Sequence, residues 1–388
     1  MHGGTVSLFL CGDVMLGRGV DQILPHPGDP ALREPSLTDA RSYVALARAA
    51  NGPFPHPVDP ARPWGDALAV LDENAPDVRV VNLETSVTRS GAFAPGKQVH
   101  YRMHPANLPC LAAARPDVCA LANNHVLDFG RRGLAETLHS LEAAELPAAG
   151  AGRNLEQAAR PVTVPVGGGR RVVVLSFGMP SSGIPVSWAA SRDTAGVHLV
   201  TEPSDAAADA VAARLAATAR PGDVTLASVH WGSNWGHRIP PEQVRFGHAL
   251  VDRGVDVVHG HSSHHPRAVE VHRGRLVLHG CGDLVDDYEG ITGHEEYRDD
   301  LRLLWFAEVG AGTGRTAALR AVPVRARRMR LRRASREETA WLRSTLQQAC
   351  EPFGTRVRTA GDGSLSFDFR SPARRTTAAE RPRRAAGR

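Results

Sequence analysis

The segment VCALANNHVLDFG, residues 118–130, joins a short apolar run to a dense group of polar side chains. Asn123, Asn124, His125 and Asp128 follow the apolar run directly. An apolar run of this length is typical of a buried strand, and open α/β sheets place functional side chains just beyond the carboxyl ends of such strands. An Asn-Asn pair alone is typical of a turn, but a histidine followed closely by an aspartate favours a functional site.

Four further segments repeat this pattern of an apolar run that ends in metal-ligand side chains. They are SLFLCGD (7–13), VRVVNLE (78–84), VTLASVHWG (224–232) and VDVVHGHSSHHP (255–266). Taken singly, a helix N-cap explains Asp13 equally well, and a lone histidine after a strand is more often a buried structural residue. Five such segments in one chain predict that their polar ends meet at a common centre.

Length and charge bound the class of protein. A chain of 388 residues holds one large α/β domain or two smaller ones. The formal net charge is +5, and arginines concentrate at 325–333 and 374–384. No aromatic residues are interleaved there, so we predict a solvated face and tail and no nucleic-acid partner. Lys97 is the only lysine, a bias that we attribute to codon usage.

Cysteine usage and the N-terminus predict the compartment. None of the five cysteines forms a C-x-x-C pair, and Cys11, Cys119 and Cys281 lie in or beside apolar runs. We therefore expect small core residues in a reducing compartment. The N-terminus lacks the organisation of a secretory signal, and no stretch reaches the roughly 20 apolar residues of a membrane span. These features predict a cytoplasmic protein with no membrane partner.

The order of predicted elements indicates the architecture. Strands expected over 5–11, 78–81, 118–122, 224–229 and 256–259 alternate with helices expected over 64–75, 105–115, 131–145, 204–219 and 241–252. Hairpins are expected at 161–176, around Gly167-Gly168-Gly169-Arg170, and at 301–324. This mixture predicts two packed sheets, each flanked by helices. We expect a catalytic domain over 1–325, a helix-and-strand extension over 326–370 packed on it, and a disordered Arg-rich tail over 371–388.

Five motifs in register resemble a known family. GDVMLGR (12–18), NLE (82–84), ANNHVLDFG (122–130), HWG (230–232) and GHSSHHP (260–266) resemble the CapA-like (poly-γ-glutamate capsule-synthesis) family. That family is a branch of the calcineurin-like metallophosphoesterase fold. The resemblance covers about residues 5–310 and implies an α/β fold, a four-layer α/β/β/α sandwich.

The resemblance also implies a ligand set. The implied metal ligands are Asp13, Glu84, Asn124, His230, His261 and His264. Phosphoesterases of this fold begin with D-x-H, whereas this chain has Met15 at the histidine position, and a thioether is a poor ligand for hard cations. We therefore expect one divalent metal ion and no organic cofactor. Hard oxygen ligands favour Ca²⁺ or Mn²⁺, and a histidine-dominated sphere would suit Zn²⁺ or Mn²⁺.

One cation beside unused histidines and aspartates suits proton transfer at a Cα atom. The candidate catalytic residues are His125, Asp128, His264, His265 and Asp283. His125 is expected to pair with Asp128, and His264 or His265 with Asp283, Asp286 or Asp287.

Three functions fit these residues. A soluble branch of the family includes an epimerase of lasso-peptide precursors, so the resemblance predicts metal-dependent epimerisation of a ribosomal peptide substrate. The first alternative is a CapA-like metallohydrolase that cleaves a phosphoester or a polyglutamate amide. The second is an assembly protein for capsule polyglutamate that uses the Arg-rich C-terminus.

Overall fold

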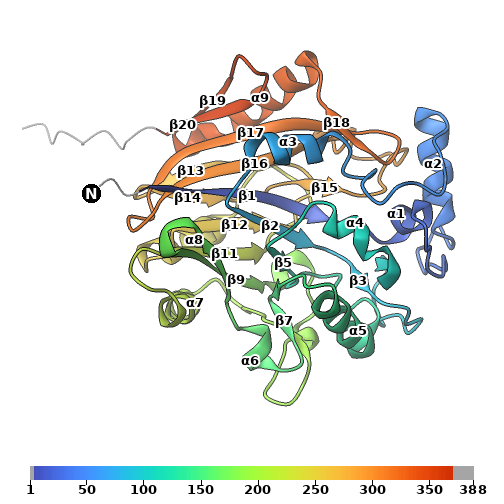
Figure 1. Ribbon diagram of the computed structural model, residues 1–388, viewed down its shortest axis with the longest axis horizontal. Helices are drawn as coiled ribbons and strands as arrows, with labels where there is room; N and C mark the ends of the chain where they lie inside the picture. The colour runs from blue at the N-terminus through green and yellow to red at the C-terminus, as the bar shows by residue number, and fades with distance from the viewer. Residues whose placement is uncertain (1–3, 370–388) are drawn as a thin grey trace, which may run out of the picture.

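Two sheets stacked face to face form the centre of the molecule (Figure 1). The computed structural model describes residues 4–369, so the predicted tail over 371–388 lies outside the described residues. The larger sheet is ten-stranded, with the order β19-β20-β17-β16-β1-β2-β5-β6 and with β15 and β18 paired to β1 and β17. The smaller sheet is six-stranded, with the order β13-β14-β12-β11-β9-β8.

The strands have the following bounds. The larger sheet contains β1 (Thr5–Val14), β2 (Val78–Leu83), β5 (Val118–Ala120), β6 (Ala148–Ala149), β15 (Asp283–Val285), β16 (Leu301–Gly310), β17 (Thr316–Ala326), β18 (Leu331–Arg333), β19 (Thr355–Thr359) and β20 (Leu365–Phe369). The smaller sheet contains β8 (Val162–Val166), β9 (Arg170–Gly178), β11 (Val224–His230), β12 (Val257–His261), β13 (Val269–His272) and β14 (Arg275–Leu278). Two short pairs complete the set, β3 (Ser86–Val87) with β4 (Arg102–Met103) and β7 (Ala151–Gly152) with β10 (Gly196–Val197).

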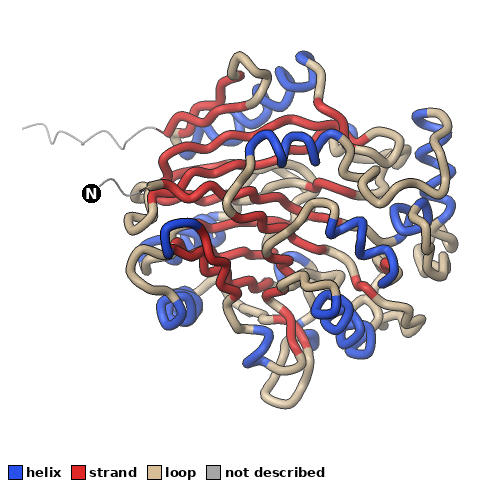
Figure 2. The backbone as a smooth tube through the Cα atoms, viewed as in Figure 1, coloured by secondary structure: helices blue, strands red, loops and turns tan. Residues whose placement is uncertain are grey.

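Helices cover the outer faces of both sheets (Figure 2). They are α1 (Arg18–Ile23), α2 (Arg41–Asn51), α3 (Asp66–Asn74), α4 (Leu108–Ala112), α5 (Gly130–Ala143), α6 (Leu155–Ala158), α7 (Asp205–Thr218), α8 (Pro241–Asp252) and α9 (Arg336–Cys350). Side chains of α7 and α8 share one apolar cluster with the outer face of β9 and β11. The helices α3, α4 and α5 pack in another with the outer face of β1 and β2.

The alternation of side chains along β1 shows why the layers form. Leu8 and Leu10 belong to the apolar cluster between the two sheets, whereas Phe9 and Cys11 belong to the cluster under the helices. Successive side chains of a strand point to opposite faces, so a strand that is apolar throughout is buried on both. The α/β/β/α sandwich is therefore confirmed, and the five cysteines are buried and free, as expected.

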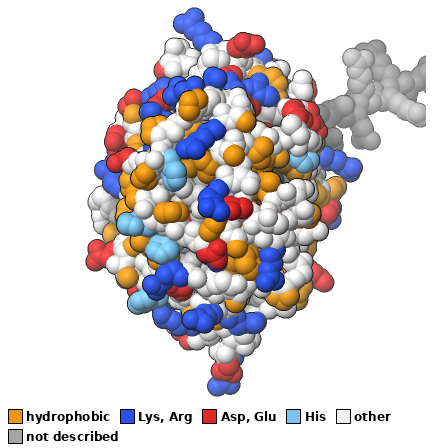
Figure 3. Space-filling view, turned by 90° about the vertical axis from the view of Figure 1, so that its right-hand side faces the viewer, with side chains coloured by type: hydrophobic (Ala, Val, Ile, Leu, Met, Phe, Trp, Pro, Cys, Tyr) orange, Lys and Arg blue, Asp and Glu red, His pale blue; other side chains and the backbone are white. Residues whose placement is uncertain are grey.

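Parallel pairing directs the strand ends to one side of the molecule. β1, β2, β5 and β6 run parallel in the larger sheet. β9, β11, β12 and β14 run parallel in the smaller sheet. Their carboxyl ends point to the right-hand side of Figure 1. Figure 3 views this side, on which basic and acidic side chains are interspersed with several histidines.

Two features of the fold differ from the expected elements. The helix expected over 105–115 is a 3₁₀ turn, Pro105–Asn107, followed by the short α4, in which Pro109 has no amide hydrogen to continue the ladder from the preceding turn. Strands β15, β18, β19 and β20 were not expected, because runs of three to five residues show too little alternation to be recognised. The expected division at residue 325 stays a prediction.

A buried carboxylate joins three elements at the edge of the smaller sheet. Glu270 on β13 contacts His248 on α8, with Nε2–Oε distances of 2.9 and 3.0 Å, and His279 after β14, at 2.9 Å. Burial alone would raise the pKa of Glu270, but the bonds from the two histidines outweigh it and lower the pKa to about 2. A carboxyl group whose pKa is lowered by folding stabilises the folded state at pH values above its unfolded pKa, and this contribution is lost as the pH falls through the folded pKa.

We predict that Glu270→Gln lowers the free energy of unfolding at pH 7 by about 2 kcal/mol. Because the folded pKa lies below the unfolded value of about 4.3, the advantage of the wild type is complete above pH 5. It is lost as the pH falls toward 2. Urea unfolding at pH 7 and at pH 3 measures the difference, with Glu337→Gln on the exposed face of α9 as the control. An equal penalty at both pH values would contradict the assignment.

Candidate metal centre

Side chains from both sheets converge at the carboxyl ends of the parallel strands. Asp13 ends β1, Glu84 follows β2 and Asn124 follows β5, all in the larger sheet. His230 and His261 end β11 and β12 of the smaller sheet and stand opposite each other in the parallel register. All but Asn124 are buried. The structure thus brings five of the six predicted metal ligands to one place, where the two sheets meet.

A close approach of two backbones sets the position of Asp13. The amide of Asp13 donates to the carbonyl of Gly282 at 3.3 Å, and Asp13 pairs with Asp283 of β15. A Cβ atom at Gly12 would lie 1.8 Å from that same carbonyl oxygen. Only glycine fits at residue 12, and the result is that two carboxylates, Asp13 and Asp283, lie side by side.

Asn82 holds the carboxylates of Asp13 and Glu84 together. Its side-chain amide donates to Asp13 Oδ1 at 2.7 Å and to Glu84 Oε2 at 3.3 Å. Its own oxygen accepts from Asn123 Nδ2 at 3.1 Å, so the amide cannot flip without losing these bonds. Oδ2 of Asp13 is buried without a hydrogen-bond partner, which is costly unless a cation or proton satisfies it.

The electrostatics of this cluster favour a bound cation. Burial, followed by the charge of Asp283, raises the pKa of Asp13 to about 7. Burial, followed by the charge of Asp13, raises the pKa of Glu84 well above its usual value. Neighbouring buried carboxylates cannot both be ionised without a compensating charge. A divalent cation supplies that charge and lowers both pKa values, so the residues present fit a metal ion.

Two histidines add nitrogen ligands to the same centre. His230 Nδ1 lies 2.8 Å from His261 Nδ1, and His230 Nε2 lies 3.0 Å from Asn124 Oδ1. Burial lowers the pKa of both histidines well below the usual value, which leaves the neutral imidazole that binds metals. Ser228 Oγ lies 3.0 Å from His261 Nε2 and orients that ring. Ligand atoms of Asp13, His230 and His261 all lie within 4.8 Å of one another.

His125 and Asp128 form a pair beside this centre. Nδ1 of His125 lies 2.6 Å from Asp128 Oδ2, and Nε2 faces Glu84 Oε1 at 3.7 Å. Lys97 contacts the other oxygen of Asp128 at 2.5 Å. Burial lowers the pKa of His125 to about 4, although the charge of Asp128 opposes this shift. The bond from Asp128 fixes the ring so that Nε2 is directed to the cluster.

A second histidine–aspartate pair lies on the other side of Asp13. Nδ1 of His264 lies 3.0 Å from both oxygens of Asp283. Burial alone would lower the pKa of His264, but the charge of Asp283 outweighs it and raises the pKa. Ligand atoms of Asp13, His264 and Asp283 also lie within 4.8 Å of one another, so His264 belongs either to this pair or to a second ligand group.

The structure does not bring His265 to the centre. Its Nδ1 lies 3.1 Å from the carbonyl oxygen of Pro266, and its ring stacks on Tyr297 with centroids 4.6 Å apart. The two residues lie in a bend after β12, where His264 is directed at Asp283 and His265 away from it. The acid/base role predicted for His265 therefore has no support in the geometry.

Several residues of the site were not recognised in the sequence. Lys97, attributed above to codon usage, contacts Asp128 and the carbonyl of Asn124. The hydroxyl groups of Tyr101 and Tyr288 lie 2.6 Å apart. The ring of Tyr101 packs against His125 at 4.5 Å, and that of Tyr288 against His264 at 5.4 Å. For Lys97 the signal available was a lone lysine in an arginine-rich chain, and Tyr288 carried none.

The α/β/β/α sandwich, with polar side chains gathered at its strand ends, has the architecture of the calcineurin-like metallophosphoesterase folds. The family model described as "Bacterial capsule synthesis protein PGA_cap" matches residues 7–288. The chain belongs to this family, and the predicted resemblance is confirmed.

Relatives are known in several bacteria. The chain is 54% identical over 362 residues to the "probable polyglutamine synthesis accessory protein" of Mycobacterium tuberculosis, covering 93% of this chain and 95% of the relative. It is 23% identical to the "PGA biosynthesis protein CapA" of Bacillus subtilis, covering 80% and 70%. It is 24% identical to the "capsule biosynthesis protein CapA" of Bacillus anthracis, covering 73% and 60%. Within residues 4–369, no helix combines the length and apolar character needed to cross a bilayer.

We predict that a divalent cation stabilises the metal-stripped protein through Asp13. At a hundredfold excess over Kd, binding adds about 2.7 kcal/mol to the free energy of unfolding, and Asp13→Asn removes this gain because it removes the unpartnered oxygen. Thermal unfolding with and without Mn²⁺ or Zn²⁺ measures the effect. Asp72→Asn, at a carboxylate that is 62% exposed, is the control. An equal gain in Asp13→Asn would place the cation elsewhere.

Proposed function

We propose that this protein is a metal-dependent enzyme that cleaves amide bonds in a polyglutamate-type chain as an accessory to polymer synthesis. The observation that carries the proposal is the His125–Asp128 pair, 2.6 Å apart, whose free nitrogen faces the buried cluster of carboxylates and histidines. A base fixed beside a cation site is the arrangement that activates water for attack on a carbonyl. In this proposal a polyglutamate chain, the substrate of the alternative function, replaces the ribosomal peptide.

The names of the relatives indicate the substrate. Those of the Bacillus proteins refer to PGA or capsule biosynthesis, and that of the Mycobacterium protein refers to polyglutamine synthesis. The bonds that link the residues of a glutamate or glutamine polymer are amides, so an enzyme that shortens such a chain cleaves amide bonds. An enzyme that trims or releases such chains serves their synthesis as an accessory.

The cation would be held by Asp13, Glu84, Asn124, His230 and His261. Mixed oxygen and nitrogen donors favour Mn²⁺ or Zn²⁺ over Ca²⁺, which takes oxygen ligands. When bound, it polarises the substrate carbonyl and lowers the pKa of water. We propose a single ion, because a second one between Asp13 and Asp283 would break the pair of His264 with Asp283.

The side chains then divide the proton transfers. His125, held by Asp128, takes a proton from water as the water oxygen bonds to the amide carbon. The carbon–nitrogen bond breaks, and the leaving nitrogen takes a proton from His264, which Asp283 orients at 3.0 Å. Lys97 contacts the second oxygen of Asp128 at 2.5 Å. This contact holds Asp128 in place and so fixes which nitrogen of His125 carries the proton.

Phosphoester hydrolysis fits this site less well. Transfer between two metal ions requires cations about 3.5–4 Å apart. Met15 stands where phosphoesterases of this fold have a histidine ligand. Its sulfur lies 3.9 Å from the hydroxyl of Tyr288. In the second ligand group, which also includes Asp13, His264 and Asp283 are already bonded to each other.

Peptide epimerisation is a second candidate function, and one observation favours it. The Tyr101–Tyr288 pair bridges the two histidine–aspartate pairs, with one ring against His125 and the other against His264. Two bases on different sides of one substrate carbon are what removal and return of a Cα proton require. The same residues would then act without cleavage.

A single assay distinguishes these reactions. The metal-loaded protein is incubated in D₂O with a γ-linked glutamate decamer, and the products are analysed by mass spectrometry. Amide cleavage predicts new amines and shorter chains, with one water added for each bond cleaved. Epimerisation predicts a mass increase of one unit per inverted residue with the chain intact.

We predict that His125→Asn lowers kcat at least a hundredfold, because a positioned base contributes about 10²–10⁴-fold, and that metal binding persists. Lys97→Met lowers kcat less, and Lys97→Arg restores part of it by keeping the charge beside Asp128. His139→Asn, at an exposed histidine of α5, is the control for the substitution itself. Cleavage that survives in His125→Asn at the wild-type rate would exclude this histidine as the base.

A further inference from the structure

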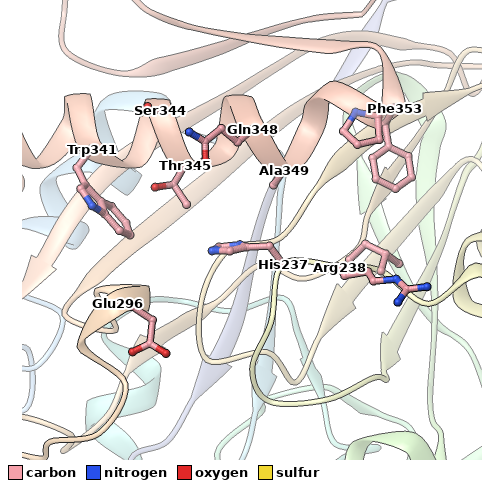
Figure 4. A pocket seen from close by; sticks show the side chains of 11 residues that line it. His237, Arg238, Glu296, Trp341, Ser344, Thr345, Gln348, Ala349 and Phe353 are labelled. Carbon is pink, nitrogen blue, oxygen red and sulfur yellow. The ribbon is translucent and has the colours of Figure 1, made fainter.

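A deep pocket lies between the C-terminal helix and the loop that follows β11. It has a volume of about 710 Å³, within the range of about 300–1,000 Å³ typical of ligand sites. His237 and Arg238 form one wall, and Trp341, Thr345 and Gln348 of α9 form the other. Figure 4 shows these α9 side chains directed at the segment of His237, with Arg238 and Glu296 at opposite ends.

The same loop joins this pocket to the metal centre. The carbonyl of Asn234 accepts from the His264 amide at 3.0 Å, and its side-chain nitrogen lies 3.0 Å from His264 Nε2. The ring of Trp235 packs on His264 with centroids 5.2 Å apart. Only two residues lie between Asn234 and His237, a span of at most about 11 Å. An extended chain bound at His264 therefore reaches the pocket within a few residues.

Hydrogen-bond donors dominate the lining near this loop. Arg238, Thr345 and Gln348 line the cavity, and Nδ1 of His237 is buried without a partner. Behind His237, at a centroid distance of 4.5 Å, the ring of His265 is 1% exposed and its Nε2 also has no partner. Buried polar nitrogens are normally paired, so these two leave the wall behind the cavity polar and short of acceptors. Glu296 is the acidic exception at the other end.

The wall formed by α9 lies beyond the part of the chain that the family model matches. That match ends at residue 288, whereas α9 begins at Arg336. Leu342 and Leu346 fix the helix in the core between the sheets, so Trp341, Thr345 and Gln348 are left to face the pocket. The C-terminal extension therefore has a position suited to selecting the substrate.

We propose that this pocket is a subsite for the anionic chain of the substrate, holding glutamyl carboxylates some residues away from the bond that reacts. The proposal rests on the proposed function for the nature of the chain. Arg238 and the donors of α9 bind carboxylates, and the indole of Trp341 covers the methylene groups between them. Glu296 disfavours carboxylates at its own end and so limits how many the pocket takes.

Direct binding tests the proposal without any turnover. A fluorescein-labelled γ-linked glutamate decamer is titrated with the full-length, metal-loaded His125→Asn protein, in which cleavage is at least a hundredfold slower, and fluorescence polarisation gives Kd. The substitutions in the pocket are made in this background. Arg238→Glu should weaken binding about tenfold or more, because it reverses a charge at the contact. Glu296→Gln should tighten binding about two- to fivefold, because it removes a repulsion. Opposite signs are not expected from a general loss of structure.

Controls separate this proposal from the proposed function. A glutamine decamer of the same length should bind more weakly and respond to neither substitution. Cleavage of a γ-linked glutamate dimer, too short to reach the pocket, should keep its kcat/KM in Arg238→Glu. If the decamer binds but neither variant changes Kd, or if both change it in the same direction, the subsite is not here, whatever reaction the metal centre performs. If no decamer binds to any variant, the pocket does not hold a glutamate chain.

Discussion

The crowding of carboxylates at the end of β1 is the interaction on which the site depends. Asp13, Glu84 and Asp283 are buried within reach of one another, and one oxygen of Asp13 lacks any partner. Bringing several carboxylates out of water is unfavourable unless opposite charge or shared protons compensate. Asn82 and His264 supply part of that compensation through hydrogen bonds. The proposed cation among Asp13, His230 and His261 would supply the rest.

The sandwich fold makes this crowding sterically feasible. The parallel strands of both sheets direct their carboxyl ends to the same side, so residues far apart in the chain meet, as the contact between Asp13 and the Ser262 amide, 249 residues apart, shows. Glycine at residue 12 lets β15 approach β1, and this approach places Asp283 beside Asp13. The stability of the apolar layers maintains the site in a geometry that its charges alone would oppose.

The five motifs and the four-layer fold were predictable because each motif follows an apolar run long enough to recognise. The pairing of His125 with Asp128 was readable from their spacing. The choice between His264 and His265 could not be predicted, because it depends on which of these adjacent side chains faces Asp283 on β15. That strand is too short to be recognised in the sequence. Lys97 was visible as the only lysine, yet its place beside Asp128 follows from tertiary structure alone. The pocket against α9 joins segments about a hundred residues apart, and no local pattern connects them.

We propose an acid/base site assembled around one cation, with a separate pocket for the rest of a chain-like substrate. In this proposal Lys97, Asp128 and Asp283 orient the two histidines and do not contact the substrate, so the buried charges around the centre outnumber the groups that react. The most direct test of the cation is anomalous diffraction from crystals grown with Mn²⁺ or Zn²⁺, collected on both sides of the metal absorption edge. The account predicts one strong peak among Asp13, His230 and His261, with Glu84 and Asn124 beside it. Density without an anomalous peak at that position, or a peak only at surface residues, would contradict it.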